Sequence, residues 1–204
     1  MSFYRRFGKR ALDLAVAVPA LIAAVPIVAV AAVSVRVTLG APVFFRQQRP
    51  GLDGRPFHVV KLRTMTNERA AEGQLLPDAQ RLSALGAALR KLSIDELPQL
   101  FNVVEGSMSL VGPRPLLMEY LSRYSPSQAR RHEVKPGMSG HAVVNGRNAI
   151  SWEEKLGFDV WYVDHVSFAV DVGILAKTVF ALLKRDGVSA GAHVTMPEFM
   201  GSKT

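Results

Sequence analysis

The most uniform stretch of the chain is the apolar run Ala11–Val35, ALDLAVAVPALIAAVPIVAVAAVSV. It contains 25 residues and one charged side chain, Asp13, near its start. As a helix that rises about 1.5 Å per residue, the run is longer than the roughly 30 Å hydrocarbon core of a bilayer. The pattern therefore predicts a helix embedded in a membrane.

Two features favour a helix that enters the membrane and returns to the same side. Pro19 and Pro26 lie inside the run, and each proline removes a backbone hydrogen bond and favours a bend. Both flanks are basic, at Arg10 and at Arg36, and positive residues favour the cytoplasmic side. We therefore expect a re-entrant helix-break-helix in residues 1–40, with the membrane break at Pro26 and Pro19. A single-span anchor and, less favoured, a cleaved signal peptide remain open.

Residues 41–204 contain no second long apolar run and are expected to form one domain. Two strand-like segments flank the turn sequence PGLDGRP at residues 50–56, which predicts a small β-hairpin. The period of two places Lys61 and Arg63 on the same face of the second strand, as a small cationic pair. An ordinary solvated strand face is the alternative interpretation of that pair.

Helical patterns follow the hairpin, at Ala79–Leu92, at about residues 96–104, and after the capping box that begins at Ser151. A last helix carries an apolar stripe formed by Ile174, Leu175, Val179, Leu182 and Leu183, flanked by Lys177, Lys184 and Arg185. This stripe either faces a core or lies on a membrane surface with its basic residues toward lipid phosphates. The expected fold is α+β and mostly helical. It has an N-terminal re-entrant anchor (1–40), a small β-hairpin, and interfacial amphipathic helices around one compact catalytic domain (41–204).

Composition narrows the chemistry. The chain has no cysteine, which excludes a disulfide framework and a cysteine-based zinc site. The formal net charge of +8 indicates an anionic partner: nucleic acid, acidic lipid headgroups or a phosphorylated substrate. A nucleic-acid partner is disfavoured because aromatic and basic residues are not interleaved and the apolar N-terminus would have no role.

The stretch SIDELPQL, Ser93–Leu100, holds two adjacent acids in front of a proline. Pro98 loses no intrahelical hydrogen bond if Asp95 is the N-cap, so we expect a helix to begin beside Asp95. The positive end of a helix favours an ionised carboxylate and can also hold phosphate oxygens. Asp95 and Glu96 are therefore either caps or chemical groups, and a carboxylate in this setting can bind Mg²⁺ or attack phosphorus.

Nearby cations favour the chemical interpretation. In GPRP, residues 112–115, each proline fixes its own φ and Pro115 also restricts Arg114, and a pre-set guanidinium suits a bidentate grip on phosphate. Arg147 lies in a turn-forming loop, NGRN. His132 is expected to be structural or on the surface.

The whole chain resembles the bacterial sugar transferases, the small monotopic polyprenyl-phosphate phosphoglycosyl transferases. The resemblance rests on the proline-broken N-terminal run and on four segments that occur in order: RPGLDGRPFHVVKLRTM (49–65), LRKLSIDELPQLFNVVEGSMSLVGPRP (89–115), RHEVKPGMSGHAVVNGRNAISWEEK (131–155) and LLKRDGVS (182–189). Among these enzymes the chain most resembles the compact members that transfer a phospho-N,N′-diacetylbacillosamine unit in protein glycosylation. One departure is Val25-Pro26, where family members commonly have Ser-Pro at the membrane break.

The resemblance implies a UDP-sugar:undecaprenyl-phosphate sugar-1-phosphate transferase. It would act at the cytoplasmic face of the bacterial inner membrane, release UMP, and supply downstream glycosyltransferases. Asp95 would be the nucleophile and a ligand of the cofactor Mg²⁺, and Glu96 would serve the acceptor phosphate. The substrate-binding positions that match are Lys61, Arg63, Arg90, Arg114 and Arg147. The alternative function is a catalytically inactive membrane scaffold of a glycan assembly complex.

Overall fold

The computed structural model describes residues 3–146, 150–184 and 198–201. After a π-helical turn at Tyr4–Gly8, the first half of the chain contains α1 (Lys9–Leu39), β1 (Phe44–Pro50), β2 (Pro56–Leu62), α2 (Asp78–Arg81), α3 (Ala84–Lys91) and α4 (Gln99–Glu105). The second half contains β3 (Ser109–Val111), α5 (Pro126–Ala129), β4 (Gly137–Ser139), α6 (His141–Val144), α7 (Trp152–His165) and α8 (Phe168–Lys184). The fold is mostly helical with a small antiparallel hairpin, as the sequence predicts.

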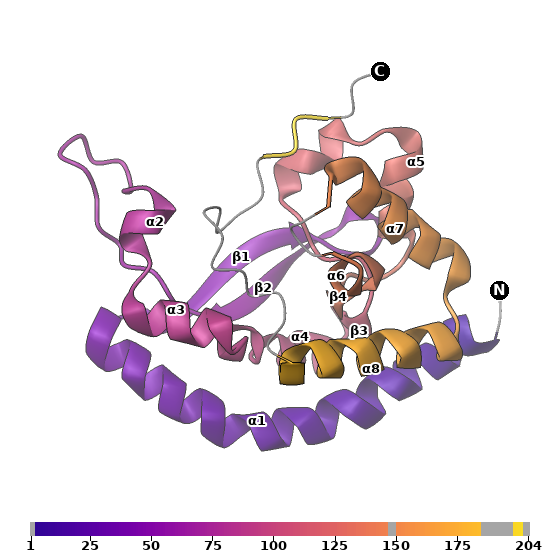
Figure 1. The fold of residues 1–204 in the computed structure, drawn as a ribbon, viewed down its shortest axis with the longest axis horizontal. Helices are drawn as coiled ribbons and strands as arrows, with labels where there is room; N and C mark the ends of the chain where they lie inside the picture. The colour runs from indigo at the N-terminus through magenta and orange to yellow at the C-terminus, as the bar shows by residue number, and fades with distance from the viewer. Residues whose placement is uncertain (1–2, 147–149, 185–197, 202–204) are drawn as a thin grey trace.

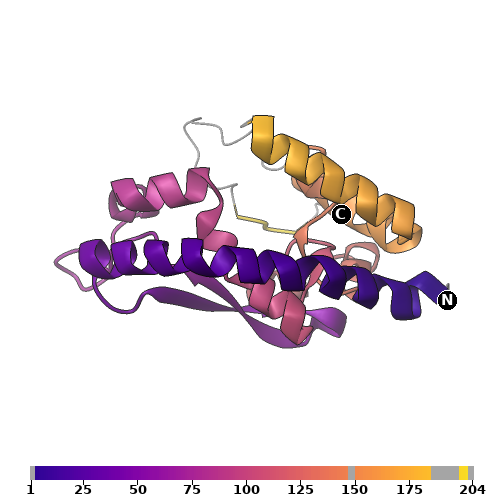
Figure 2. The ribbon, with the colours of Figure 1, turned by 90° about the horizontal axis from the view of Figure 1, so that it is seen from below.

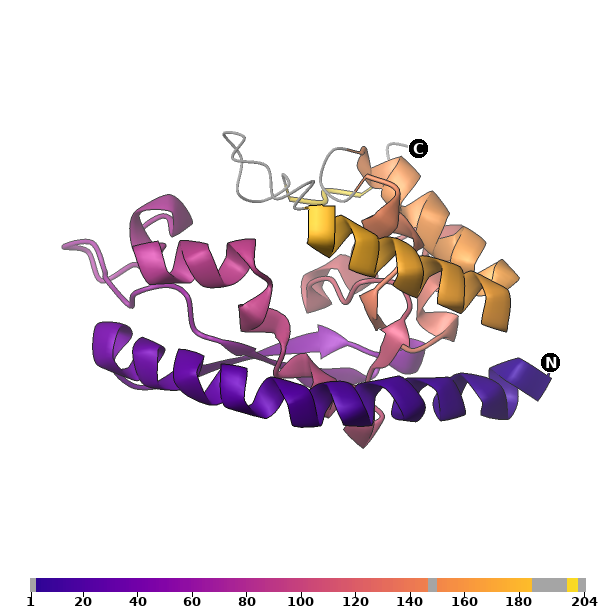
Figure 3. The same ribbon diagram turned by 60° about the horizontal axis from the view of Figure 1, so that its bottom comes forward.

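Helix α1 runs beneath the rest of the protein along its longest axis (Figures 1 and 3). It is a single helix that passes through Pro19 and Pro26, so the two separate helices expected from the sequence are not seen. The helix is bowed instead, and its concave side faces the other elements (Figure 1). Proline removes one hydrogen bond without ending a helix whose neighbours hold it, and the bend is then spread over several turns.

A narrow stripe of small residues on α1 faces the protein. Ala17, Ala24 and Ala31 are buried at intervals of seven residues. A straight helix drifts by about 20° per heptad, so it must curve to keep such a stripe against one partner. The opposite face exposes large apolar side chains, with Ile22 68% and Val30 70% exposed. By length and composition α1 could cross a membrane, and it leaves an apolar face uncovered along its length.

Both ends of α1 are attached to the same body. At its start, the guanidinium of Arg10 donates to the carbonyls of Val103 and Val104, at 2.6 and 2.7 Å, where α4 ends. At its other end, Arg63 donates to the carbonyl oxygens of Leu39, Gly40 and Ala41. Cations placed on the last carbonyls of a helix also stabilise its negative end.

The core joins α1 to the elements that follow it. Ala17 and Ala24 belong to the same buried cluster as Val59 of β2, Val103 of α4 and Ile174 of α8. Seen from below, α1 crosses the middle of the molecule between the hairpin and α8 (Figure 2). The separation into residues 1–40 and 41–204 as two units stays a prediction.

The predicted hairpin is confirmed. Strands β1 and β2 pair antiparallel, with Phe45 opposite Lys61 and Arg49 opposite Phe57. The turn between them uses positive φ at Asp53 (54°) and Gly54 (71°). The predicted capping box at the start of α7 is also confirmed, because Ser151 and Glu154 satisfy each other's backbone N–H groups.

Other helical boundaries differ from expectation. The predicted helix Ala79–Leu92 is interrupted because Ser83 accepts a hydrogen bond from Gly86 and caps a new helix, α3. In α8, Ile174 is buried whereas Val179 and Leu182 are 55% and 47% exposed. The apolar stripe of α8 therefore serves the core in its first half and the surface in its second half. The predicted stripe residue Leu183 lies outside the described side chains.

Candidate active site

The acidic pair lies in a 3₁₀ turn, Ile94–Glu96, that precedes α4. Ser93 enters this turn with a positive φ of 55°, and α4 itself begins at Gln99, after Pro98. Asp95 is not itself an N-cap, because Ser93 is the N-cap of the turn and Pro98 is the N-cap of α4. A helical turn does begin within one residue of Asp95, at Ile94. Neither carboxyl group is therefore used to cap the helix backbone.

Glu96 is held by two cations from different parts of the chain. Its Oε1 accepts from Lys61 Nζ of β2 at 2.7 Å and from the guanidinium of Arg114. Burial alone would raise the pKa of Glu96, but Arg114 and Lys61 together lower the pKa to about 2. Glu96 is therefore ionised at every physiological pH, and it fixes the positions of the two cations.

Asp95 is in the opposite situation. Asp95 is only 7% exposed. Its carboxylate makes no hydrogen bond or ion pair within the described part of the chain. Burial and the adjacent Glu96 raise the pKa of Asp95, while Lys61, Arg90 and Arg114 oppose that rise. A buried acid without a partner, close to several cations, is an arrangement typical of a reactive group.

A pocket of about 170 Å³ is lined by Lys61 and Arg114, the two cations that hold Glu96, whereas neither acid lines it. Its walls include both cations that hold Glu96, together with Gln99 at the start of α4 and alternate residues of β1, namely Phe45, Gln47 and Arg49. The period of two in β1 explains why these three side chains share one face. A cavity lined by three basic residues, two of which are bound to Glu96, is suited to a phosphorylated ligand.

Close backbone contacts fix Arg114 near Glu96. Strands β3 and β4 pair in parallel, and Gly112 follows β3 directly. A Cβ at Gly112 would lie 2.3 Å from the Lys135 carbonyl, and a Cβ at Gly137 would lie 2.1 Å from the Gly112 nitrogen. Only glycines permit this approach, and it delivers the Pro113–Pro115 segment to the mouth of the pocket.

The other predicted binding residues have separate outcomes. Arg90 makes a 3.0 Å hydrogen bond to Thr64 Oγ1 and is one of the charges that act on Asp95. Arg63 does not form a cationic pair with Lys61, because its guanidinium holds the carbonyls at the end of α1. Its expected place among the phosphate-binding residues is thus corrected to a structural one. Arg147 lies outside the described residues.

The carboxylates of Asp95 and Glu96 can be compared with the way in which proteins usually bind Mg²⁺. No group of three or more His, Cys, Asp or Glu side chains comes together within the described ranges. Mg²⁺ commonly binds one or two carboxylates and completes its shell with water and substrate phosphates. Asp95 fits that mode because its oxygens are uncommitted, whereas Glu96 already binds Lys61 and Arg114.

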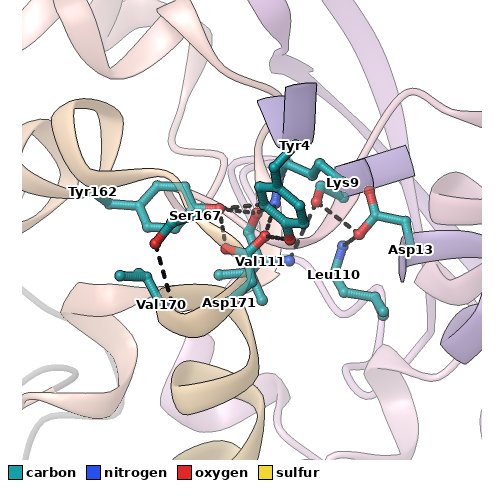
Figure 4. A network of polar contacts seen from close by, with 10 residues as sticks. Tyr4, Lys9, Asp13, Leu110, Val111, Tyr162, Ser167, Val170 and Asp171 are labelled. Carbon is teal, nitrogen blue, oxygen red and sulfur yellow. Dashed lines mark hydrogen bonds and ion pairs between the residues drawn. The ribbon is translucent and has the colours of Figure 1, made fainter. Parts of the chain in front are cut away.

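A second polar network was not anticipated from the sequence (Figure 4). The buried carboxylate of Asp171 in α8 accepts from Tyr4, Lys9 and Tyr162 at 2.5, 2.8 and 2.6 Å. Beside it, Asp13 accepts from Ser109 Oγ and the Leu110 N–H at 2.9 and 3.0 Å. Asp13, the single acid of the apolar run, therefore attaches α1 to β3. Its unusual position among apolar residues was the one feature of the sequence that could have indicated this contact.

Comparison with known protein families gives a match over residues 4–185 to the family described as bacterial sugar transferase. The chain belongs to this family. A *Bacillus subtilis* (strain 168) protein named uncharacterized sugar transferase EpsL is 55% identical over 194 residues, which cover 95% of this chain and 96% of that protein. The match confirms the family that the motifs predict, and the family also indicates association with a membrane.

Two further relatives carry more specific names. An undecaprenyl-phosphate galactose phosphotransferase of *Salmonella typhimurium* is 37% identical over 89% of this chain and 42% of its own length. A UDP-glucose:undecaprenyl-phosphate glucose-1-phosphate transferase of *Caulobacter vibrioides* is 37% identical over 87% of this chain and 70% of its own length. The chain thus spans less than half of the *Salmonella* protein. These names agree with the predicted enzyme class, and the diacetylbacillosamine subtype stays a prediction.

Proposed function

We propose that this chain is a UDP-sugar:undecaprenyl-phosphate sugar-1-phosphate transferase that acts through a covalent phosphosugar-aspartyl intermediate. The observation that carries the proposal is Asp95, a buried carboxylate without a partner, beside Glu96 and its two cations. The names of the *Salmonella* and *Caulobacter* relatives support the two substrates.

In the first half-reaction, the UDP-sugar diphosphate lies against Lys61, Arg90 and Arg114, whose positive charges offset the negative charge of the transition state. A carboxylate oxygen of Asp95 attacks the sugar-bearing phosphorus. A new Asp95–phosphorus bond forms as the bridging P–O bond to UMP breaks, and UMP leaves with the electron pair. The low exposure of Asp95 limits the access of water, which would otherwise hydrolyse the acyl phosphate.

In the second half-reaction, a phosphate oxygen of undecaprenyl phosphate attacks the same phosphorus. The Asp95–phosphorus bond breaks, the polyprenyl-diphosphate sugar forms, and the carboxylate is regenerated. With a pKa of about 2, Glu96 is too weak a base to remove a proton efficiently near neutral pH. We therefore assign Glu96 to the placement of Lys61 and Arg114 around the acceptor phosphate.

A bound Mg²⁺ would be held by Asp95 together with substrate oxygens, and it would supply additional positive charge to the diphosphate. The protein's own contribution is the free carboxylate and the ordered cations around it. Arg147 remains a proposed ligand of the diphosphate or nucleotide.

We further propose that α1 lies in one leaflet of the bacterial inner membrane and that the catalytic domain faces the cytoplasm. Two observations support this placement. Both ends of α1 are attached to the same body, through Arg10 and Arg63. It exposes an apolar face, and Phe168 and Phe180 of α8 are exposed as well. In this placement the polyprenyl chain stays in the bilayer while its phosphate reaches the pocket, and downstream glycosyltransferases receive the product at the same surface.

A direct test is to incubate the purified protein with UDP-glucose, UDP-galactose or UDP-N,N′-diacetylbacillosamine and no acceptor. Intact-protein and peptide mass spectrometry should then show a sugar-phosphate adduct on Asp95, and added undecaprenyl phosphate should remove it. UMP release without any adduct would exclude the covalent route. The absence of UMP release with every sugar, when both substrates and Mg²⁺ are present, would favour the membrane-scaffold alternative.

A further inference from the structure

The segment Pro113–Arg114–Pro115 has few backbone N–H groups with which to attach itself to the rest of the protein. Two of its three residues are prolines, which have no backbone N–H. The segment must therefore be fixed mainly through its carbonyl oxygens. The Pro113 carbonyl accepts from the N–H of Gly137 at 3.0 Å. The Arg114 carbonyl accepts from a side chain, Arg131 Nη2, at 2.7 Å.

Arg131 is buried as deeply as any long side chain in the described ranges. Its side chain is 1% exposed, and that of its partner Asp159 is 3% exposed. Nε and Nη2 of Arg131 both donate to Asp159 Oδ2, at 3.0 and 2.7 Å, while Nη1 donates to the Tyr124 hydroxyl at 3.3 Å. The guanidinium is therefore fixed by α7 on one side and holds the Arg114 backbone on the other.

A buried ion pair is a poor choice for stability alone. Desolvation of the two charges offsets most of their attraction, and well-packed apolar residues often stabilise a protein as much. The guanidinium also cannot touch a ligand, because it is enclosed. Unlike an apolar side chain, Arg131 donates a directed hydrogen bond to the carbonyl oxygen of Arg114. That oxygen is two bonds away from the Cα that carries the Arg114 side chain.

We propose that Arg131, oriented by Asp159, is a positioning residue that holds the Arg114 guanidinium in place at the pocket. This inference rests on the proposed function, since Arg114 is assigned there to the diphosphate. It extends the site to α7, an element that contributes no side chain to the pocket wall described above.

The test is a double-mutant cycle between the two arginines, with UMP release from UDP-sugar as the measurement. Arg131→Lys should lower kcat/KM for the UDP-sugar about tenfold, within the range of coupling seen for residues of one hydrogen-bond network. In the Arg114→Ala background the same change should have less than about a twofold effect, because the group being positioned is absent. A purely structural role would give equal losses in both backgrounds.

Asp159→Asn provides a second cycle that preserves the side-chain shape if Arg131→Lys fails to fold. The matched control is Arg130→Lys, the neighbouring residue, whose exposed ion pairs with Glu133 and Asp164 do not reach Arg114. It should leave kcat/KM unchanged. Equal losses in the two backgrounds, or no loss in either, overturn the inference while wild-type turnover upholds the proposed function. A wild-type protein that releases no UMP refutes the proposed function itself.

Discussion

Asp95 and Asp171 are both buried aspartates, at 7% and 0% exposure, yet they have opposite surroundings. Asp171 receives hydrogen bonds on both oxygens from two tyrosines and Lys9. Asp95 receives none within the described part of the chain, although the charges of three cations, Lys61, Arg90 and Arg114, act to lower its pKa. The contrast separates a carboxylate that stabilises the fold from one that is kept available for a ligand. Burial and charge alone do not distinguish them, and the presence or absence of partners does.

The largest expected effect comes from Asp95→Asn. We expect UMP release to fall by at least about a thousandfold, because the nucleophile is lost while binding groups remain. The thermal midpoint should stay the same or rise, since the substitution removes an unpartnered buried acid. Enzyme assays and thermal unfolding in the same detergent would measure both quantities. Turnover at the wild-type rate would end the nucleophile assignment.

Asp171→Asn should show the reverse pattern. It leaves Lys9 without its charged partner in a buried setting, so we expect a loss of about 3 kcal/mol in the free energy of unfolding. Asp164→Asn is the matched control. It breaks an exposed ion pair with Arg130 and should change the free energy of unfolding far less than Asp171→Asn does. If Asp171→Asn is as mild as the control, the network in Figure 4 does not hold α1 in place.

His132 shows whether a buried polar group without a hydrogen-bond partner must have a catalytic or binding role. Its Nε2 is buried without a hydrogen bond among the described residues, and burial together with Arg131 lowers its pKa to about 4. The unfolded chain, with a pKa near 6.5, binds more protons between these values, so stability should fall as pH drops through this window. The loss between pH 7 and pH 5 should be roughly 2 kcal/mol. His132→Gln should flatten this dependence in denaturant titrations, and an unchanged slope would mean that other groups cause it.

The smallest expected effect is a displacement of the pH profile. The charge on Glu96 helps to raise the pKa of Asp95. Glu96→Gln should therefore move the acidic limb of kcat/KM to lower pH, because Asp95 then ionises more readily beside Lys61 and Arg114. Glu105→Gln, an exposed acid at the far end of α4, should leave that limb where it is. A shift to higher pH would contradict the proximity of the two acids.

Local patterns in the sequence predicted much of this site. The hairpin and the capping box at Ser151 agree with expectation, whereas the ion pairs of Glu96 with Lys61 and Arg114 were not predicted. Asp95 is not itself the N-cap because a 3₁₀ turn, which needs fewer residues, intervenes before Pro98. Arg63 was misplaced because its partners lie at the end of α1, 22–24 residues earlier.

Other features had no local signal at all. Strands β3 and β4 have three residues each, which is too short for a period of two to be recognised. The partners of Asp171 lie up to 167 residues away in the chain. Long-range pairs of this kind are set by the tertiary fold, so a single sequence can suggest that a buried acid needs partners but cannot name them.

The docking of α1 also has a consequence for the order of events during synthesis. Lys9 is added to the growing chain 162 residues before Asp171. At translation rates of about 5–20 residues per second, that interval is on the order of 10–30 s. During this time the apolar helix is complete while the ion pair that fixes its start has not formed. The nascent helix must therefore be sheltered by lipid or by a chaperone until α8 arrives, and a slower ribosome would lengthen its exposure.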